Sequence, residues 1–251
     1  MRQITFFCIE MVEQLYDNQF KTVLNWSSGK DAALAYHLLL QNPAYKVTHL
    51  LTTLSEEYKR VFMHGIREEL LDMQAERMGL PLTKVKLPAS PDDEVYKSAM
   101  QNILTQLQNE GITTAAYGDI FLEDLKKYRE QQLAKIGLNA IFPLWKKDTK
   151  ELVSMVEATG IEAIIVCVND KYLGKEFLGR KIDANFLNDL PENIDACGEN
   201  GEYHSFVYNA PYFSSPINIK TGEIVYKKYA PADSSDGGWD TGFYFLDVVA
   251  L

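Results

Sequence analysis

The chain has 251 residues, which is enough for one large domain or for a large domain with a small one. It carries 35 acidic and 25 basic residues, so its formal net charge is -10 and its surface as a whole would repel a phosphate backbone. Nucleic acid is therefore not an expected partner. The cysteines Cys8, Cys167 and Cys197 lie far apart with no histidine at zinc spacing, which favours reduced thiols in a cytoplasmic protein.

Residues 1–21 stand apart as an N-terminal extension. Glu10 and Glu13 interrupt its apolar patch before the patch reaches the length of a signal or membrane segment. No other stretch approaches the roughly 18 consecutive apolar residues of a membrane helix, so we expect neither secretion nor membrane spanning. The extension either packs on the domain or forms a subunit contact in a homo-oligomer.

From residue 22 to residue 190, extended apolar runs alternate with amphipathic segments. Strands are predicted at 22–26, 47–54, 82–88, 113–120 and 161–168. Helices are predicted at 30–41, 65–79, 92–109, 124–136 and 148–159. This alternation is typical of a sheet that helices cover on both faces, so we predict a doubly wound, mostly parallel α/β fold of the Rossmann-like type.

The pattern changes after about residue 191. Residues 191–251 are predicted to form a smaller α+β region that binds substrate, beside a nucleotide-binding domain at 22–190. Thr221 and Gly222 separate two extended runs and predict a hairpin, followed by a polar loop at 234–242 and a final strand.

The sequence SSGKD at 27–31 joins the first predicted strand directly to the first predicted helix. In a parallel sheet, ligands collect where strands end and helices begin. Helix-start amides carry partial positive charge, Gly29 permits close backbone approach, and Lys30 adds a full charge, so phosphate is the expected ligand. Asp31 could hold a magnesium ion. The loop is not a kinase-type P-loop, because Leu24 stands where that motif has Gly and Asp31 stands where it has Ser or Thr. A surface turn before a helix is the alternative.

The sequence SSGKDA resembles the Ser-Gly-Gly-Lys-Asp-Ser loop of the PP-loop ATP pyrophosphatases, which are adenine nucleotide alpha hydrolase-like proteins of the HUP type. Further stretches resemble one branch of that superfamily, the diphthine-ammonia ligase family. They are MHGIREELLDMQAERMGLPL (63–82), YGDI (117–120), FPLWKKDTKELV (142–153), LGRKID (178–183) and CGENGEYHSFV (197–207).

The resemblance implies an ATP-dependent ligase that uses magnesium. Such an enzyme activates a carboxylate acceptor as an acyl adenylate, releases AMP and pyrophosphate, and forms an amide with ammonia or another amine. The acceptor could be a modified protein side chain. The implied ATP-binding residues are Ser27, Ser28, Gly29, Lys30, Asp31, His64, Gly118 and Asp119, with Lys30 and Asp31 also catalytic. The alternative for YGDI is a turn that only ends a strand. The alternative for His64 is a side chain that only forms a hydrogen bond at a helix start.

The loop CGENGEYH is the most substrate-like feature. Glu199 and Glu202 lie three residues apart among glycines, so both carboxylates could reach one point to orient ammonia or accept its proton. The implied substrate-binding residues are Arg180, Asp183, Gly198, Glu199, Gly201, Glu202 and Tyr203. We expect Arg180 to hold a carboxylate and Asp183 to hold Arg180 in place. The alternative for the CGENGEYH loop is an acidic surface turn, and the alternative for Arg180 and Asp183 is an exposed ion pair.

Four residues depart from the family pattern. Ser28 and Ala32 stand where the loop usually has Gly and Ser, and Asn200 and His204 stand where Gly and an acid are common. The loop departures motivate a second hypothesis, a nucleotide-binding sensor without turnover. A tRNA-modifying PP-loop enzyme is a third, against which the acidic balance and the isolated cysteines argue.

Overall fold

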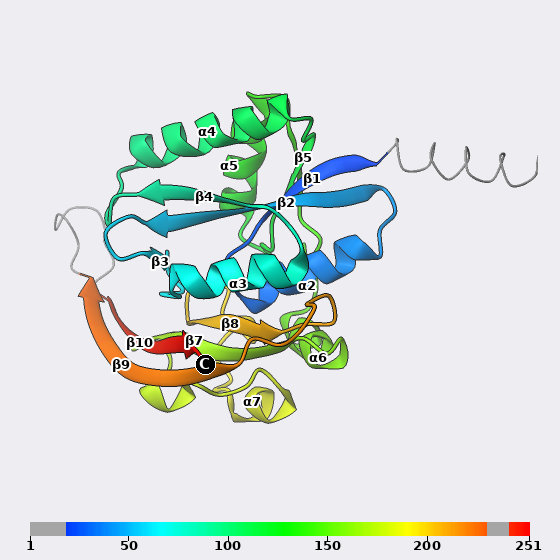
Figure 1. Cartoon of the computed structure of the whole chain (residues 1–251). Coiled ribbons are helices and arrows are strands. Elements are labelled where there is room, and N and C mark those ends of the chain that lie inside the picture. Colours follow the sequence, from blue (N-terminus) through cyan, green and yellow to red (C-terminus); the bar gives the residue numbers. More distant parts are fainter. Residues whose placement is uncertain (1–18, 230–240) are drawn as a thin grey trace, which may run out of the picture.

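The computed structural model describes residues 19–229 and 241–251. Nearly all of the predicted extension at 1–21 and most of the predicted polar loop at 234–242 lie outside the described residues. Two sheets lie in layers, with α2 and α3 between them and with α4 and α5 on the outer face of the first sheet (Figure 1). Among the described helices, none has the length and apolar character that crossing a bilayer requires.

The first sheet is mostly parallel, which confirms the predicted fold class. Its strands are β1 (Phe20–Asn25), β2 (Tyr45–Ser55), β3 (Arg60–Val61), β4 (Leu82–Leu87), β5 (Thr114–Ala116) and β6 (Asn139–Ile141). They run in the order β3-β2-β1-β5-β6, with β4 also paired to β2, and only β3 is antiparallel. The chain continues from β1 to β2 on one side and later returns to β5 on the other. Such a switch point is where doubly wound sheets bind ligands.

The helices of this domain form where the sequence predicts them. They are α2 (Lys30–Leu40), α3 (Glu68–Met78), α4 (Asp93–Asn109), α5 (Glu123–Ala134) and α6 (Thr149–Ala158). Asp148 caps α6 by accepting hydrogen bonds from the amides of Lys150 and Glu151. Helix α3 begins three residues later than predicted, because the preceding residues form β3 and a turn.

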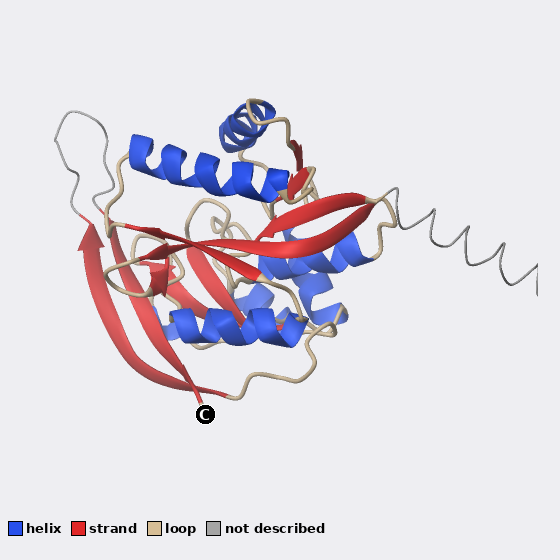
Figure 2. Ribbon diagram, turned by 45° about the horizontal axis from the view of Figure 1, so that its top comes forward, coloured by secondary structure: helices blue, strands red, loops and turns tan. Residues whose placement is uncertain are grey.

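The second sheet is antiparallel, in the order β8-β7-β10-β9. Its strands are β7 (Glu162–Asn169), β8 (Tyr203–Asn209), β9 (Ile219–Tyr229) and β10 (Thr241–Ala250), accompanied by the 3-10 turn η1 (Lys175–Phe177) and α7 (Ala184–Asp189). Figure 2 shows β9 and β10 curving along one side of the molecule. The strand predicted at 161–168 therefore exists, but it belongs to this sheet. Strand β7 is buried on both faces, so its residues form the continuous apolar run that is typical of a parallel strand. Such a run does not specify which strand pairs with it.

The predicted hairpin at Thr221 and Gly222 is wrong. Both residues lie inside β9, which pairs with β10 from Ile219 to Tyr229. The register shifts on β10 between Leu246 and Val248, opposite these residues, as a bulge requires. Glycine in a strand marks such an irregularity as often as it marks a turn.

One hydrophobic core connects the two sheets. It joins Leu24 of β1, Leu34 of α2 and Leu70 of α3 to Ile165 of β7 and Phe206 of β8, all of them buried. A smaller cluster lies beneath α4 and α5 on the other face of the first sheet. The start of α2 is thus packed between the sheets and is held in place by both.

Asp247 of β10 connects the second sheet to the first domain through two arginines. Its carboxylate accepts hydrogen bonds from Arg67 Nε at 2.9 Å and Nη2 at 2.7 Å, and from Arg60 Nη2 at 2.9 Å. The hydrogen bonds from Arg67, and then those from Arg60, outweigh burial and lower the pKa of Asp247 to about 2. The folded pKa thus lies below the unfolded value of about 4.

We expect Asp247→Asn to lower the free energy of unfolding at pH 7 by about 1–2 kcal/mol, a range reduced for the partial exposure of both arginines. A depressed folded pKa contributes stability above pH 4 that is lost as the pH falls toward 2, so the difference from the parent should shrink over that range. Urea unfolding at several pH values measures it. Asp72→Asn, at a half-exposed ion pair with Lys84, is the control and should change little. A difference that is the same at pH 3 and pH 7 would contradict the assignment.

Candidate active site

The loop at 27–31 follows β1 at the switch point and leads into α2, as predicted. Strand β8 of the second sheet holds it: the amide of Lys30 donates to Ser205 Oγ at 3.0 Å, and the amide of Val207 donates to the Ser28 carbonyl at 3.0 Å. The loop is therefore fixed from both sheets. Its predicted members, Ser27 to Asp31, come together at one helix start.

The Lys30 side chain is 2% exposed. Its Nζ donates to Asp31 Oδ2 at 2.9 Å and to the Cys197 carbonyl, and lies 4.8 Å from the centre of the Tyr203 ring. Burial lowers the pKa of the ammonium group, but Asp31, Tyr203 and Cys197 together raise it by more, so the pKa lies well above its usual value. A permanent positive charge thus lies between α2 and the loop that begins at Cys197.

Two further loops reach the start of α2. A Cβ on Gly118 would lie 2.9 Å from the carbonyl carbon of Asp31 and 3.0 Å from the amide of Ala32, so this approach requires glycine. The Ile120 amide donates to Glu199 Oε1 at 2.8 Å, which connects the YGDI loop to the acidic loop. The predicted residues from three distant segments are therefore brought together.

The Glu199 carboxyl group has a pKa of about 7. Burial raises this pKa above the usual value of a glutamate, and the hydrogen bond from Ile120 lowers it. The negative charges of Asp31 and Asp119 raise the pKa further. The group therefore exchanges its proton near neutral pH, as a general acid or base must.

Glu202 does not share this environment, which corrects the expectation that both glutamates meet at one point. It is buried, and its oxygens accept hydrogen bonds from the Asn200 amide at 2.9 Å, from Asn200 Nδ2 at 3.0 Å and from the Asp195 amide at 3.2 Å. Its carboxylate thus holds the loop closed around Gly198 and Gly201, both of which have positive φ. Neighbouring Tyr203 donates its hydroxyl to the Ala196 carbonyl at 2.7 Å.

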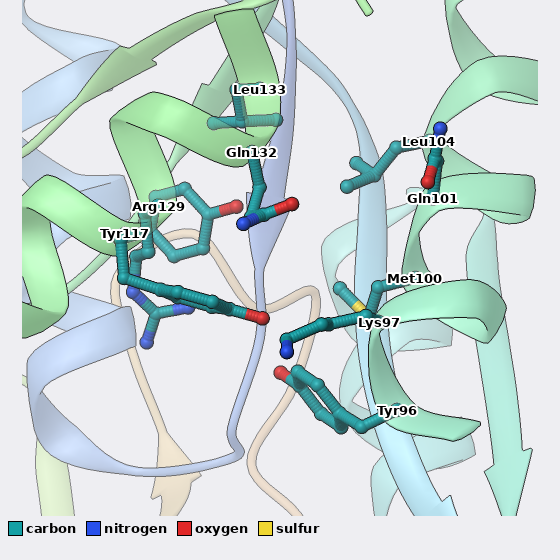
Figure 3. A pocket seen from close by; sticks show the side chains of 10 residues that line it. Tyr96, Lys97, Met100, Gln101, Leu104, Tyr117, Arg129, Gln132 and Leu133 are labelled. Atoms are coloured by element: carbon teal, nitrogen blue, oxygen red, sulfur yellow. The ribbon is translucent and has the colours of Figure 1, made fainter. Parts of the chain in front are cut away.

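Asp119 forms an ion pair with Arg129 of α5, with 2.6 Å between Oδ2 and Nε, and Arg129 lies 4.1 Å from the centre of the Tyr117 ring. Figure 3 shows Arg129 beside the Tyr117 ring, whose hydroxyl points toward Tyr96 and Lys97 of α4. The cavity there has a volume of about 40 Å³, enough for water but not for a nucleotide base. Sequence reasoning missed Arg129, because a charged residue on a polar helix carries no local signal.

His64 lies against the loop at 27–31. Its Nδ1 is 2.9 Å from the Ser205 carbonyl, and a Cβ on Gly29 would lie 2.6 Å from its ring. The ring centre is 4.7 Å from that of His204. Burial lowers the pKa of His64 to about 4, against the hydrogen bond to Ser205, so its ring is neutral at pH 7.

The expected pairing of Arg180 with Asp183 does not form, and Arg180 lies before the start of α7. Arg180 makes an ion pair with Asp189, at 2.6 Å between Nη2 and Oδ2, while Asp183 caps α7 by accepting from the Phe186 amide at 2.8 Å. An Asp one residue before a helix satisfies a free amide there, and that geometry takes its carboxylate away from the arginine.

Gln74 of α3 is a further contributor that sequence reasoning missed. It is fully buried, accepts from Trp26 Nε1 at 2.8 Å, and donates to the carbonyls of Ser28 at 3.2 Å and Val207 at 2.6 Å. One amide thus joins β1, the phosphate loop and β8. Its signal in the sequence is a polar residue on the apolar face that carries Leu71.

Ser28 has a φ of 73°, in the left-handed region that disfavours side chains, and its buried Oγ has no hydrogen-bond partner among the described residues. Such a φ costs about 1–2 kcal/mol outside glycine. We therefore expect Ser28→Gly to raise the free energy of unfolding by about 1 kcal/mol, although glycine also gains entropy in the unfolded chain.

Urea unfolding of Ser28→Gly beside Ser27→Gly is the test. The φ of Ser27 is not positive, so its replacement should cost about 0.5–1 kcal/mol. If Ser28→Gly were the less stable of the two, the strain would not exist.

Two family models match consecutive parts of the chain: the diphthamide synthase N-terminal domain matches residues 20–140 and the C-terminal domain matches residues 148–232. Curated relatives named diphthine-ammonia ligase come from Danio rerio, 27% identical over 193 residues, and Rattus norvegicus, 28% identical over 190 residues. These matches cover 68% of this chain and 73% and 70% of the relatives. The models meet where the first sheet ends and α6 begins, and together they span most of the sequence; the chain belongs to the diphthamide synthase family.

Proposed function

We propose that this protein is an ATP-dependent ligase that forms an amide through an acyl adenylate and releases AMP and pyrophosphate. The names of its relatives support a ligase. The observation that carries the adenylation step is the buried Lys30 ammonium beside the first amides of α2, at the switch point of a parallel sheet.

In the first half-reaction, an oxygen of the acceptor carboxylate attacks the alpha phosphorus of ATP, and the bond from that phosphorus to the bridging oxygen breaks. Negative charge develops on the departing pyrophosphate. The Lys30 ammonium group stabilises that charge, and Asp31 and the Cys197 carbonyl hold it in place. The Lys30 amide, which donates to Ser205 Oγ, fixes the loop that carries it.

Magnesium, when bound, neutralises phosphate charge. The site offers it the oxygen ligands that it prefers, the carboxylates of Asp31 and Asp119, and magnesium usually needs only one or two protein carboxylates besides the phosphates. Among the described residues no three His, Cys, Asp or Glu side chains gather as a metal cluster.

In the second half-reaction, the amine nitrogen attacks the acyl carbon and AMP leaves. The nitrogen must lose a proton, and in this proposal Glu199 accepts it; its position beside the Ile120 amide and near Asp31, and its pKa of about 7, support that role. The amine can be free ammonia.

The test is to incubate the protein with ATP, magnesium, ammonium and a panel of carboxylates and to identify the products. AMP and pyrophosphate are expected. Release of ADP and phosphate would reject adenylation, and tight ATP binding without any product would favour a nucleotide sensor instead.

A further inference from the structure

Strand β9 (Ile219–Tyr229) is the outer strand of the second sheet. It pairs with β10 along one side, and no other described strand pairs with its second side. Figure 1 shows β9, in orange, along the outside of that sheet. A long strand in this position presents a row of backbone amides and carbonyls with which a further strand can pair.

The middle of this edge strand is apolar and exposed. Ile224, Val225 and Tyr226 follow one another and are 46%, 53% and 48% exposed. Val225 lines the same hollow as Tyr58 and Met63, which are each 51% exposed, so the apolar surface continues onto the first domain. Proteins usually protect an edge strand by making it short or by placing charges or proline on it. Three exposed apolar residues in a row therefore indicate a surface that another chain covers.

A bulge limits where a partner strand can pair with β9. Gly222 and Glu223 together face the single residue Asp247 of β10. Because a bulge bends its strand, the regular part of the free edge begins at about Glu223 and runs to Tyr229.

A second copy of the same strand complements this regular part. Two strands related by a twofold axis run antiparallel. With the axis at Val225, Val225 lies opposite itself, Ile224 lies opposite Tyr226, and Glu223 lies opposite Lys227. Paired β-branched residues, an aliphatic residue beside an aromatic one, and opposite charges are all favourable across strands. An ammonium group has three donors, so Lys227 can meet this carboxylate beside the contacts that it already makes.

The neighbouring registers are less favourable. With the axis at Tyr226, Val225 would lie opposite Lys227 and Ile224 opposite Lys228, which removes both the apolar pairs and the charge pairs. With the axis at Ile224, the bulge itself would have to enter the pairing. The charge pattern and the bulge thus favour the same register.

We propose that β9 is the contact of a homodimer, in which the second sheets of two copies join edge to edge around a twofold axis at Val225. The contact is closed, because it uses the exposed edge of both copies and leaves none for a third. The opposite edge of the sheet is already occupied, since the Val207 amide of β8 donates to the Ser28 carbonyl. This inference is independent of the proposed function.

The residue on the axis gives a selective test, because Val225 faces its own copy. Sedimentation velocity of the full chain over a range of concentrations should show a monomer–dimer equilibrium. Val225→Lys and Val225→Glu each place two like charges opposite each other, so each should weaken dimerisation by about tenfold or more. An equimolar mixture of the two variants places lysine opposite glutamate and should restore the dimer, which a misfolded variant could not do. Val95→Lys, at an exposed valine of α4, is the control and should dimerise like the parent.

Three results would overturn the proposal. A parent that is monomeric at every concentration would mean that another segment of this chain or a different protein covers the strand. A dimer that both charged variants leave intact would mean that the copies meet through another surface. A mixture that stays as monomeric as each charged variant alone would exclude the pairing of Val225 with itself. None of these readouts uses ATP, so a failure of the ligase proposal does not affect them.

Discussion

Lys30→Met will slow the exchange of pyrophosphate into ATP by about 10²- to 10³-fold or more, the usual effect of removing one preorganised group that stabilises transition-state charge. The exchange reports the first half-reaction alone. Methionine has a similar length and no charge, so it occupies the buried space of Lys30 without its hydrogen bonds to Asp31 and Cys197.

Removing Lys30 also leaves Asp31 and the Cys197 carbonyl without their donor, which costs stability although Asp31 is 30% exposed. The exchange rate is therefore compared at equal concentrations of folded protein, determined by urea unfolding of each variant. Lys84→Met is the control, because Lys84 is likewise a lysine held in ion pairs, with Glu68 and Asp72, but lies on β4, away from the switch point. If Lys30→Met bound ATP and exchanged pyrophosphate like the parent, the phosphates would lie elsewhere.

The position and backbone course of the loop at 27–31 could be predicted because its signals are local. A strand that runs without a linker into a helix, with Gly29 and Lys30 at the junction, specifies both the backbone shape and the charge. The parallel order of the sheet then gives the position of Gly118, since β5 pairs with β1. The loop needed only the periodicity and the rule that ligands bind at the carboxyl edge of a sheet, whereas Gly118 was predicted from the family resemblance.

The parts that could not be predicted depend on partners distant in sequence. Gln74 donates to the Ser28 carbonyl, 46 residues away, and Arg129 pairs with Asp119, 10 residues away. The pattern of α3 marks Gln74 as a polar residue on an apolar face but does not reveal its partner, and the pattern of α5 gives no sign of either. Strand β7 has the composition of a parallel strand, and only its pairing with β8 and β10 places it in the antiparallel sheet.

Glu199 and Glu202 lie in the same loop, but their surroundings in the structure differ. We therefore expect their replacement to affect the rate of amide formation differently. We expect Glu199→Gln to lower the rate of amide formation by about 10²-fold or more, the typical contribution of a positioned base. Pyrophosphate exchange into ATP should change much less, because it needs no proton acceptor. Lys30 and Glu199 would thus act on separate half-reactions.

The pKa of Glu199 also predicts how the rate of amide formation changes with pH. Burial raises the pKa of Glu199 to about 7, so the carboxylate that accepts a proton is scarce below pH 7 and predominates above it. The parent rate should therefore rise with pH through about 7 and then level off, when measured with an amine that stays unprotonated across this range. In Glu199→Gln this rise should be absent, since the amide does not titrate.

Glu202→Gln is the control that separates a base from a loop constraint. Its carboxylate is buried among donors from Asp195 and Asn200, so the variant should lose about 1–3 kcal/mol of stability. Because Glu199 remains, the rise in rate through pH 7 should persist in the folded fraction. A rise that persists in Glu199→Gln and disappears in Glu202→Gln would assign the proton transfer to the other glutamate, and the hydrogen bond from Ile120 would then only anchor Glu199.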